Sequence, residues 1–116
     1  MKKSTVAFAA GLLLLLGTFL STAVFAEEHA YAAIEHTSAA IAQGKADKAP
    51  ALVEHVEKAL EHAKMAENVA KGHLKSEMKS AVDELEKAIT AGNAGDTKIA
   101  VIPLEKALGF LQAGNK

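Results

Sequence analysis

Residues 52–64 read LVEHVEKALEHAK, and this stretch decides the fold. Its apolar side chains recur every three or four positions, at Leu52, Val56, Ala59, Leu60 and Ala63. This period places them on one face of an α-helix, with the charged residues opposite. The chain on both sides is rich in Ala, Glu, Lys and Leu, which favour helix, and no alternating β-branched run indicates a strand.

Glycines and capping residues divide the chain after residue 27 into four predicted helices. We expect them over about 28–43, from 47 or 50 to 71, over 74–91 and over 96–113. Gly44 is a predicted C′ residue, and Asp47 and Asp96 are predicted N-caps. Pro103 either kinks the last helix or marks its start. The short connections predict an all-α, antiparallel up-down-up-down four-helix bundle.

Similar apolar stripes define the predicted core faces of the other three helices. We expect these faces to be Tyr31, Ile34, Ser38 and Ile41; Leu74, Met78, Ala81, Val82, Leu85 and Ile89; and Ile99, Ile102, Ala107, Leu108 and Leu111. The core is small and rich in alanine, which predicts modest stability without a bound ligand.

The chain contains an internal repeat with a shift of 48 residues. The shift aligns Gly44 with Gly92 and residues 57–60 with residues 105–108, both of which read EKAL. The repeated unit is one helical hairpin, about 28–71 and about 74–113, and two such hairpins make the bundle. The histidines are not repeated: His29, His36, His55 and His62 align with Glu77, Glu84, Pro103 and Phe110.

The spacing of the histidines is the chemical signal in this sequence. His29 and His36 are seven residues apart, and so are His55 and His62. Seven residues are two helical turns, so each helix carries its two histidines along one line, roughly 10 Å apart. An antiparallel turn about residues 45 and 46 places His29 opposite His62 and His36 opposite His55. The sequence therefore predicts two cross-helix histidine pairs.

Each of these four histidines directly follows a glutamate: Glu28, Glu35, Glu54 and Glu61. Imidazole with carboxylate is a donor set for Cu(II), Ni(II) or Zn(II). The four glutamates are candidate additional ligands, although glutamate on an exposed helix face is ordinary. His73 stands apart beside Gly72, and we interpret it as a helix N-terminal residue and a candidate for a separate site.

The helical wheel places the histidines beside the core rather than inside it. His36 is about 160° from Ile34, and His55 is about 100° from Val56. Water would complete the coordination of a metal at such positions, and the metal would exchange readily. This arrangement favours uptake, buffering or delivery over a structural metal.

Other chemistry has less support in the sequence. Haem is disfavoured, because the available axial ligands are Met65, Met78 and His73, and methionines in apolar stripes are usually core residues. No histidine has a glutamate three positions before it, as the di-iron bundles require. Motifs of nucleophilic catalysis, phosphate loops and HExxH are absent from the sequence, and we predict that the protein is not an enzyme.

The composition excludes several further classes of function. The 116 residues contain no cysteine, which excludes disulfides, thiolate metal sites and covalent haem attachment. The formal net charge is −1, which gives no basic face for nucleic acid. The expected partners are metal ions, and we expect a monomer.

Residues 1–26 read as a cleaved secretory signal peptide. Lys2 and Lys3 precede a stretch without charge that includes an unbroken leucine run, and Val24-Phe25-Ala26 offers a cleavage site. The alternative is an uncleaved membrane anchor, because the stretch is nearly long enough to span a bilayer. We expect cleavage after Ala26, a bundle domain over residues 27–116, a periplasmic location and no membrane attachment.

The signal peptide, the helix-rich composition and the EHVEKALEHAK phrase of residues 54–64 resemble the small periplasmic metal-binding proteins of ammonia-oxidising and related bacteria. The resemblance implies a monomeric four-helix bundle that takes up several divalent metals, copper foremost. It implies a ligand role for His29, His36, His55 and His62, and less directly for His73. Members of that family carry histidines on all helices, whereas here the second hairpin has almost none.

The sequence therefore leaves two possible functions. The first is periplasmic binding or buffering of divalent transition metals, with Cu(II) favoured over Ni(II) or Zn(II). The second is a helical interaction or stress-related module with little or no metal chemistry. Only the first requires the antiparallel register of the histidines.

Overall fold

The computed structural model describes residues 22–115. They form four helices: α2 (Thr22–Lys45), α3 (Ala49–Val69), α4 (Gly72–Asn93) and α5 (Thr97–Gly114). Within this part of the chain there is no strand. Most of the predicted signal peptide lies outside the described residues. No helix among residues 22–115 is long and apolar enough to cross a membrane.

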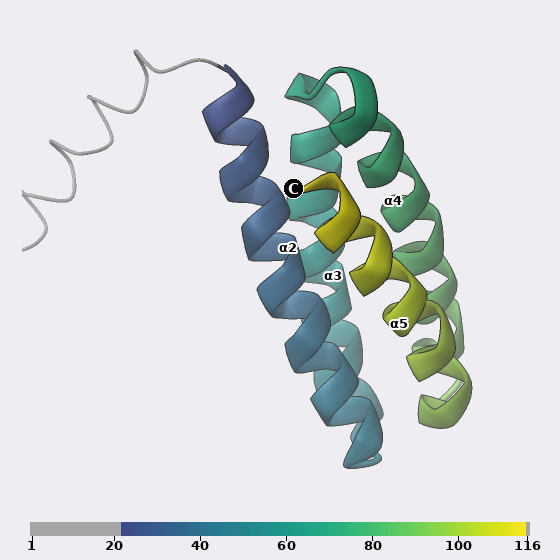
Figure 1. Cartoon of the computed structure of the whole chain (residues 1–116). Helices are drawn as coiled ribbons and strands as arrows, with labels where there is room; N and C mark the ends of the chain where they lie inside the picture. The colour runs from purple at the N-terminus through teal and green to yellow at the C-terminus, as the bar shows by residue number, and fades with distance from the viewer. Residues whose placement is uncertain (1–21, 116) are drawn as a thin grey trace, which may run out of the picture.

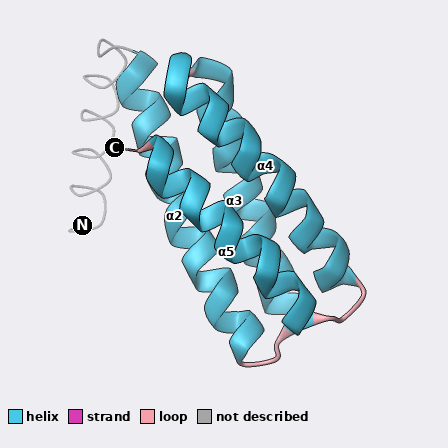
Figure 2. Cartoon of the chain, turned by 45° about the vertical axis from the view of Figure 1, so that its right-hand side comes forward, coloured by secondary structure: helices cyan, strands magenta, loops and turns pink. Residues whose placement is uncertain are grey.

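The four helices form the predicted antiparallel bundle (Figure 1). Each helix packs against the next one along the chain, and α5 closes the ring by packing against α2. The loops that join α2 to α3 and α4 to α5 lie at one end of the bundle (Figure 2). At this end the Thr97 hydroxyl donates a hydrogen bond of 2.7 Å to the Asp47 carboxylate, which ties the α2–α3 loop to the start of α5.

The core faces of α3 and α4 agree with the prediction. Leu52, Val56, Ala59 and Ala63 of α3 are fully buried, and Leu60 is partly buried. In α4 the predicted stripe is buried over Met78, Ala81, Val82 and Leu85, with Leu74 and Ile89 partly buried against it.

The predicted face of α2 was partly wrong. Ile41 is buried and Ile34 is partly buried against the core, as predicted. Tyr31 is 58% exposed and Ser38 is exposed, whereas the buried face is Ala26, Ala30, Ala33, Thr37, Ala40, Ile41 and Gly44. Both stripes have a helical period, but the predicted one continues into Glu27 and Lys45. The stripe of alanines stays small and uncharged over its whole length, so it is the face that lets α2 approach its neighbours closely.

The predicted face of α5 was also partly wrong. Ile99 and Ile102 are 54% and 56% exposed, and Ala100, Pro103 and Leu104 are buried in their place. The stripe of Ile99 and Ile102 continues into Lys106, whose charge favours solvent. Ala107 and Leu111 are buried as predicted. The helix begins at Thr97 and passes through Pro103, so the proline does not mark its start.

Two predicted helix boundaries have a different physical basis in the structure. Gly44 lies inside α2, where a Cβ would be 2.5 Å from Cγ2 of Val101; glycine is needed there for close helix packing and not as a C′ residue. Asp47 has φ of 60° in the loop and does not cap α3, whose N-cap is Lys48. The Asp96 cap is confirmed, because its carboxylate accepts from the Ile99 amide.

Candidate metal centre

The antiparallel packing of α2 and α3 forms both predicted histidine pairs. Nδ1 of His29 lies 3.0 Å from Nδ1 of His62, and Nδ1 of His36 lies 3.5 Å from Nδ1 of His55. Both separations are within hydrogen-bond reach, and the tautomers of the two rings decide which Nδ1 donates and which accepts. The register that the sequence predicted for the hairpin is therefore confirmed.

The two pairs are joined into one histidine array, which consists of His29, His62, His36 and His55. The rings of His36 and His62 are nearly parallel, with an interplanar angle of 6° and centroids 5.8 Å apart. Within the pairs the centroids are 5.3 and 5.7 Å apart. At the end of the array, the ring of Phe25 stacks on His29. The sequence predicted the pairs, but it did not predict the stacking that connects them.

The imidazoles of the array are half-buried in the interface between α2 and α3, as the helical wheel predicted. Burial lowers the pKa of His36 below its ordinary value of 6.5. Repulsion from His62, His55 and Lys58 acts in the same direction. The negative charge of Glu35 opposes the shift. His36 is therefore held in its neutral form, which is the form that binds metal.

The Nδ1 separations suit two nitrogens that share one ion. At a usual metal–nitrogen distance of about 2.0–2.1 Å, a separation of 3.0 Å corresponds to an angle of roughly 95° at the metal. A separation of 3.5 Å corresponds to roughly 117°. These angles fall near the values of square-planar and tetrahedral sites, so the separation in either pair is compatible with two adjacent ligands of one ion.

The four candidate glutamates do not join the histidine pairs. Glu28, Glu35, Glu54 and Glu61 are all exposed. Among the described side chains, no group of three or more His, Asp or Glu residues gathers as a metal site. The structure brings the imidazoles together in twos, and water would supply the remaining ligands of an ion.

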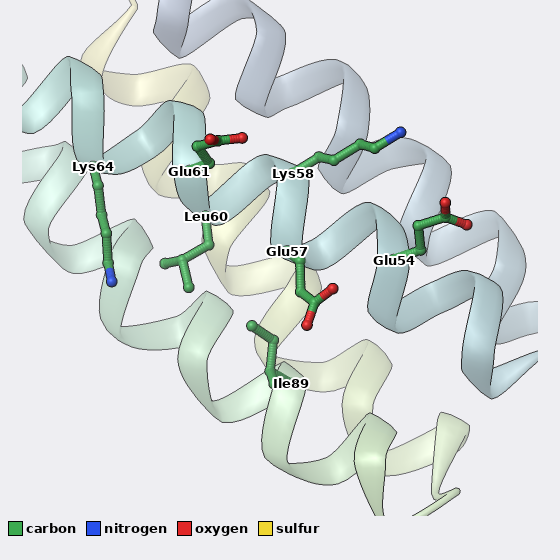
Figure 3. A pocket seen from close by; sticks show the side chains of 7 residues that line it. All are labelled: Glu54, Glu57, Lys58, Leu60, Glu61, Lys64 and Ile89. Carbon is green, nitrogen blue, oxygen red and sulfur yellow. The ribbon is translucent and has the colours of Figure 1, made fainter.

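Glu54 and Glu61 instead line an open groove between α3 and α4, together with Glu57 and Lys64 (Figure 3). The Lys64 side chain points toward α4, whereas Lys58 leaves α3 in a different direction. The groove carries mixed charge, which is typical of a solvated helix surface.

His73 lies at the start of α4, separate from the array. Its Nε2 donates to the backbone carbonyl of Ala113 in the last turn of α5, at 3.2 Å. Its Nδ1 is 4.0 Å from the Glu77 carboxylate, and the side chain is 67% exposed. His73 thus satisfies a carbonyl at a helix C-terminus, a role that does not require metal.

A four-helix bundle with paired imidazoles on one hairpin is an all-α protein suited to binding small ions. The whole described bundle falls within residues 1–114, which match the family model described as small metal-binding protein, and the chain belongs to this family. Membership makes metal binding its general property and places it in a binding family rather than an enzyme family. A search of curated proteins finds no match to the chain.

Proposed function

We propose that the protein binds and buffers divalent transition metals in the periplasm, with Cu(II) favoured, through His29–His62 and His36–His55. The single observation that carries this proposal is the pair of Nδ1 separations, 3.0 and 3.5 Å. Family membership supports metal binding in general, and the predicted signal peptide supports export. Ni(II) and Zn(II) are expected to bind more weakly than Cu(II), in the Irving–Williams order.

The half-burial of the array favours buffering over permanent retention. Each pair supplies two nitrogens, and solvent can reach the remaining coordination positions. An ion held in this way exchanges faster than one enclosed by four protein ligands. Because each pair joins α2 to α3, a bound ion also stabilises the folded hairpin.

Isothermal titration with Cu(II) tests the site. We expect the wild-type protein to bind about two ions, and we expect His29→Ala/His62→Ala and His36→Ala/His55→Ala to lose about one each. The quadruple variant should lose most of the heat. His73→Ala serves as the matched control and should keep the wild-type titration. Unchanged stoichiometry in the quadruple variant would refute the assignment.

The second candidate function, a helical interaction module, is favoured by one observation. Ile99 and Ile102 of α5 are more than half exposed, and they border a groove that Pro103 and Lys106 also line. If the quadruple variant binds metal as the wild type does, this surface becomes the better starting point for the function.

A further inference from the structure

The predicted cleavage after Ala26 gives the mature chain the N-terminal sequence Glu27-Glu28-His29. A histidine at the third position of a free N-terminus is a distinctive arrangement in coordination chemistry. The α-amine, the backbone nitrogens of residues two and three, and the imidazole then offer four nitrogens in fused chelate rings. Such a planar set of nitrogens suits Cu(II) and Ni(II), which favour square-planar coordination.

We propose that the mature N-terminus is a further metal site that binds one Cu(II) or Ni(II) ion through four nitrogens. The donors are the α-amine of Glu27, the backbone nitrogens of Glu28 and His29, and Nδ1 of His29. The α-ammonium and the two amides release their protons to solvent, and the metal keeps its oxidation state. This site deepens the proposed function and rests on it, since it serves the same ions, and it also requires the predicted cleavage.

The helical position of these residues makes the backbone nitrogens available. In the full chain, α2 begins at Thr22, so the amides of residues 27–30 lie within the helix. Removal of residues 1–26 removes the carbonyls that these amides would bond, because each helical N–H pairs with the residue four positions earlier. The first four N–H groups of any helix lack such a partner. Metal binding to the nitrogens of Glu28 and His29 therefore displaces no hydrogen bond that these nitrogens donate in the mature chain. The planar chelate unwinds the first turn locally, which releases the carbonyls of Glu27 and Glu28 from the amides of Tyr31 and Ala32.

The surroundings of Glu27 and Glu28 are open to an arriving cation. Both residues are exposed, and with Tyr31 and Asn115 they line an open hollow on the surface. Two carboxylates beside the site raise the local concentration of divalent cations. Ala26 is fully buried in α2, so the Ala26–Glu27 bond must be cut before the bundle folds.

The terminal site and the histidine array share one atom. Nδ1 of His29 closes the N-terminal chelate, and the same atom lies 3.0 Å from Nδ1 of His62. When the four terminal nitrogens hold an ion, His29 is withdrawn from its pair, while His62 keeps its stacking partner His36. The His36–His55 pair is left complete.

The test uses the full-length chain, exported and processed by the cell, with the mature protein purified and its N-terminus established by intact mass. Glu28→Pro removes the amide proton at position 28, so the nitrogen can no longer become an anionic ligand, and proline is tolerated in the first turn of a helix. Glu28→Ala removes the same carboxylate but keeps the amide. The measurements are the visible and electron paramagnetic resonance spectra of added Cu(II), and the yellow, diamagnetic state of added Ni(II).

We expect the wild-type and Glu28→Ala proteins to show the spectra of square-planar, four-nitrogen complexes. Glu28→Pro should lose these spectra, and His29 should return to its pair with His62, so the number of bound Cu(II) ions should change little. The variant His36→Ala/His55→Ala/His62→Ala should keep the four-nitrogen spectrum, because it retains all four terminal donors.

Three results would overturn the inference: an N-terminus other than Glu27, a four-nitrogen spectrum that survives Glu28→Pro, or its loss in the triple histidine variant. In each case Cu(II) bound by the histidine pairs would still support the proposed function. Conversely, a Glu28→Pro protein that binds no Cu(II) at all would refute the pairs and leave the terminal site standing.

Discussion

Replacing Thr37 by valine is expected to stabilise the bundle, because the hydroxyl of Thr37 is buried without a partner. Thr37 is fully buried in α2, and its Oγ1 makes no hydrogen bond within the described part of the chain. Valine keeps the branched shape and puts a methyl group in place of the hydroxyl. The repeat predicted from the sequence aligns Thr37 with Leu85, which is apolar and buried.

The size of the effect follows from the desolvation of the hydroxyl. An unsatisfied buried polar group costs about 1–3 kcal/mol. Threonine and valine have similar restrictions on χ1 in a helix, so helix propensity changes little. We expect Thr37→Val to raise the free energy of unfolding by about 1 kcal/mol, which corresponds to about 4–8 °C in Tm for a domain of this size.

Thr97→Val is the matched control for this substitution. Thr97 is 4% exposed, but its hydroxyl donates to the Asp47 carboxylate at 2.7 Å. The same change there should lower stability by about 1 kcal/mol, since it removes a hydrogen bond to a charged group. Thermal and urea unfolding of the metal-free proteins, followed by far-ultraviolet circular dichroism, measure both variants. If Thr37→Val destabilises as much as Thr97→Val, the reasoning about the unpartnered hydroxyl is wrong.

The remaining predictions concern packing, charge and pH. Gly44→Ala should destabilise the folded bundle by about 1–3 kcal/mol through overpacking, because the added Cβ would lie 2.5 Å from Val101. Gly109 has open space around it, so Gly109→Ala should stabilise the bundle by about 0.5–1 kcal/mol in the same unfolding assay. Lys58→Ala should raise the Cu(II) affinity of the His36–His55 pair about threefold, because it removes a positive charge that acts on His36. Lys64, whose Nζ is 3.8 Å from the Glu86 carboxylate, provides the control, and Lys64→Ala should leave the titration unchanged. Equal effects of the two substitutions would contradict the electrostatic explanation. Cu(II) affinity should fall roughly tenfold or more from pH ~7.5 to ~5.5, since protons compete for imidazole, and a flat profile would indicate carboxylate binding. Because the pKa of His36 is lowered, the folded state binds fewer protons than the unfolded state below about pH 6.5. The free energy of unfolding of the metal-free protein should therefore fall as the pH drops through this range. The fall should be less steep in His36→Ala.

The fold could be predicted from the sequence because local signals agree along most of the chain. In α3 the apolar residues lie on one stripe and the charges opposite, so only one face can be buried. In α2 two stripes compete: the large side chain of Tyr31 is exposed, and Ile34 is only partly buried against the core. Helix packing selected the alanines because they permit close approach, which is a property of the neighbouring helices and not of α2 alone.

The histidine pairs could be predicted because antiparallel register is set by the turn alone. The stacking of His36 on His62 depends on side-chain rotamers across the interface and leaves no signal in spacing. The electrostatic effect of Lys58 on His36 likewise acts across the helix interface, and the sequence of neither helix reveals it by itself.

The difference in packing between the two hairpins explains why half-buried imidazoles are tolerated in so small a core. Among the largest fully buried side chains, the second hairpin supplies Met78, Leu85, Leu104 and Leu111, whereas the first supplies Leu52, Val56 and Thr37. The second hairpin therefore contributes most of the bulky apolar packing, and α2 rests on it through alanines. A hairpin that lined its own interface with polar rings would bury too little apolar surface to fold alone. Because its partner hairpin supplies that surface, the α2–α3 interface can keep its imidazoles close to water and in reach of an arriving ion.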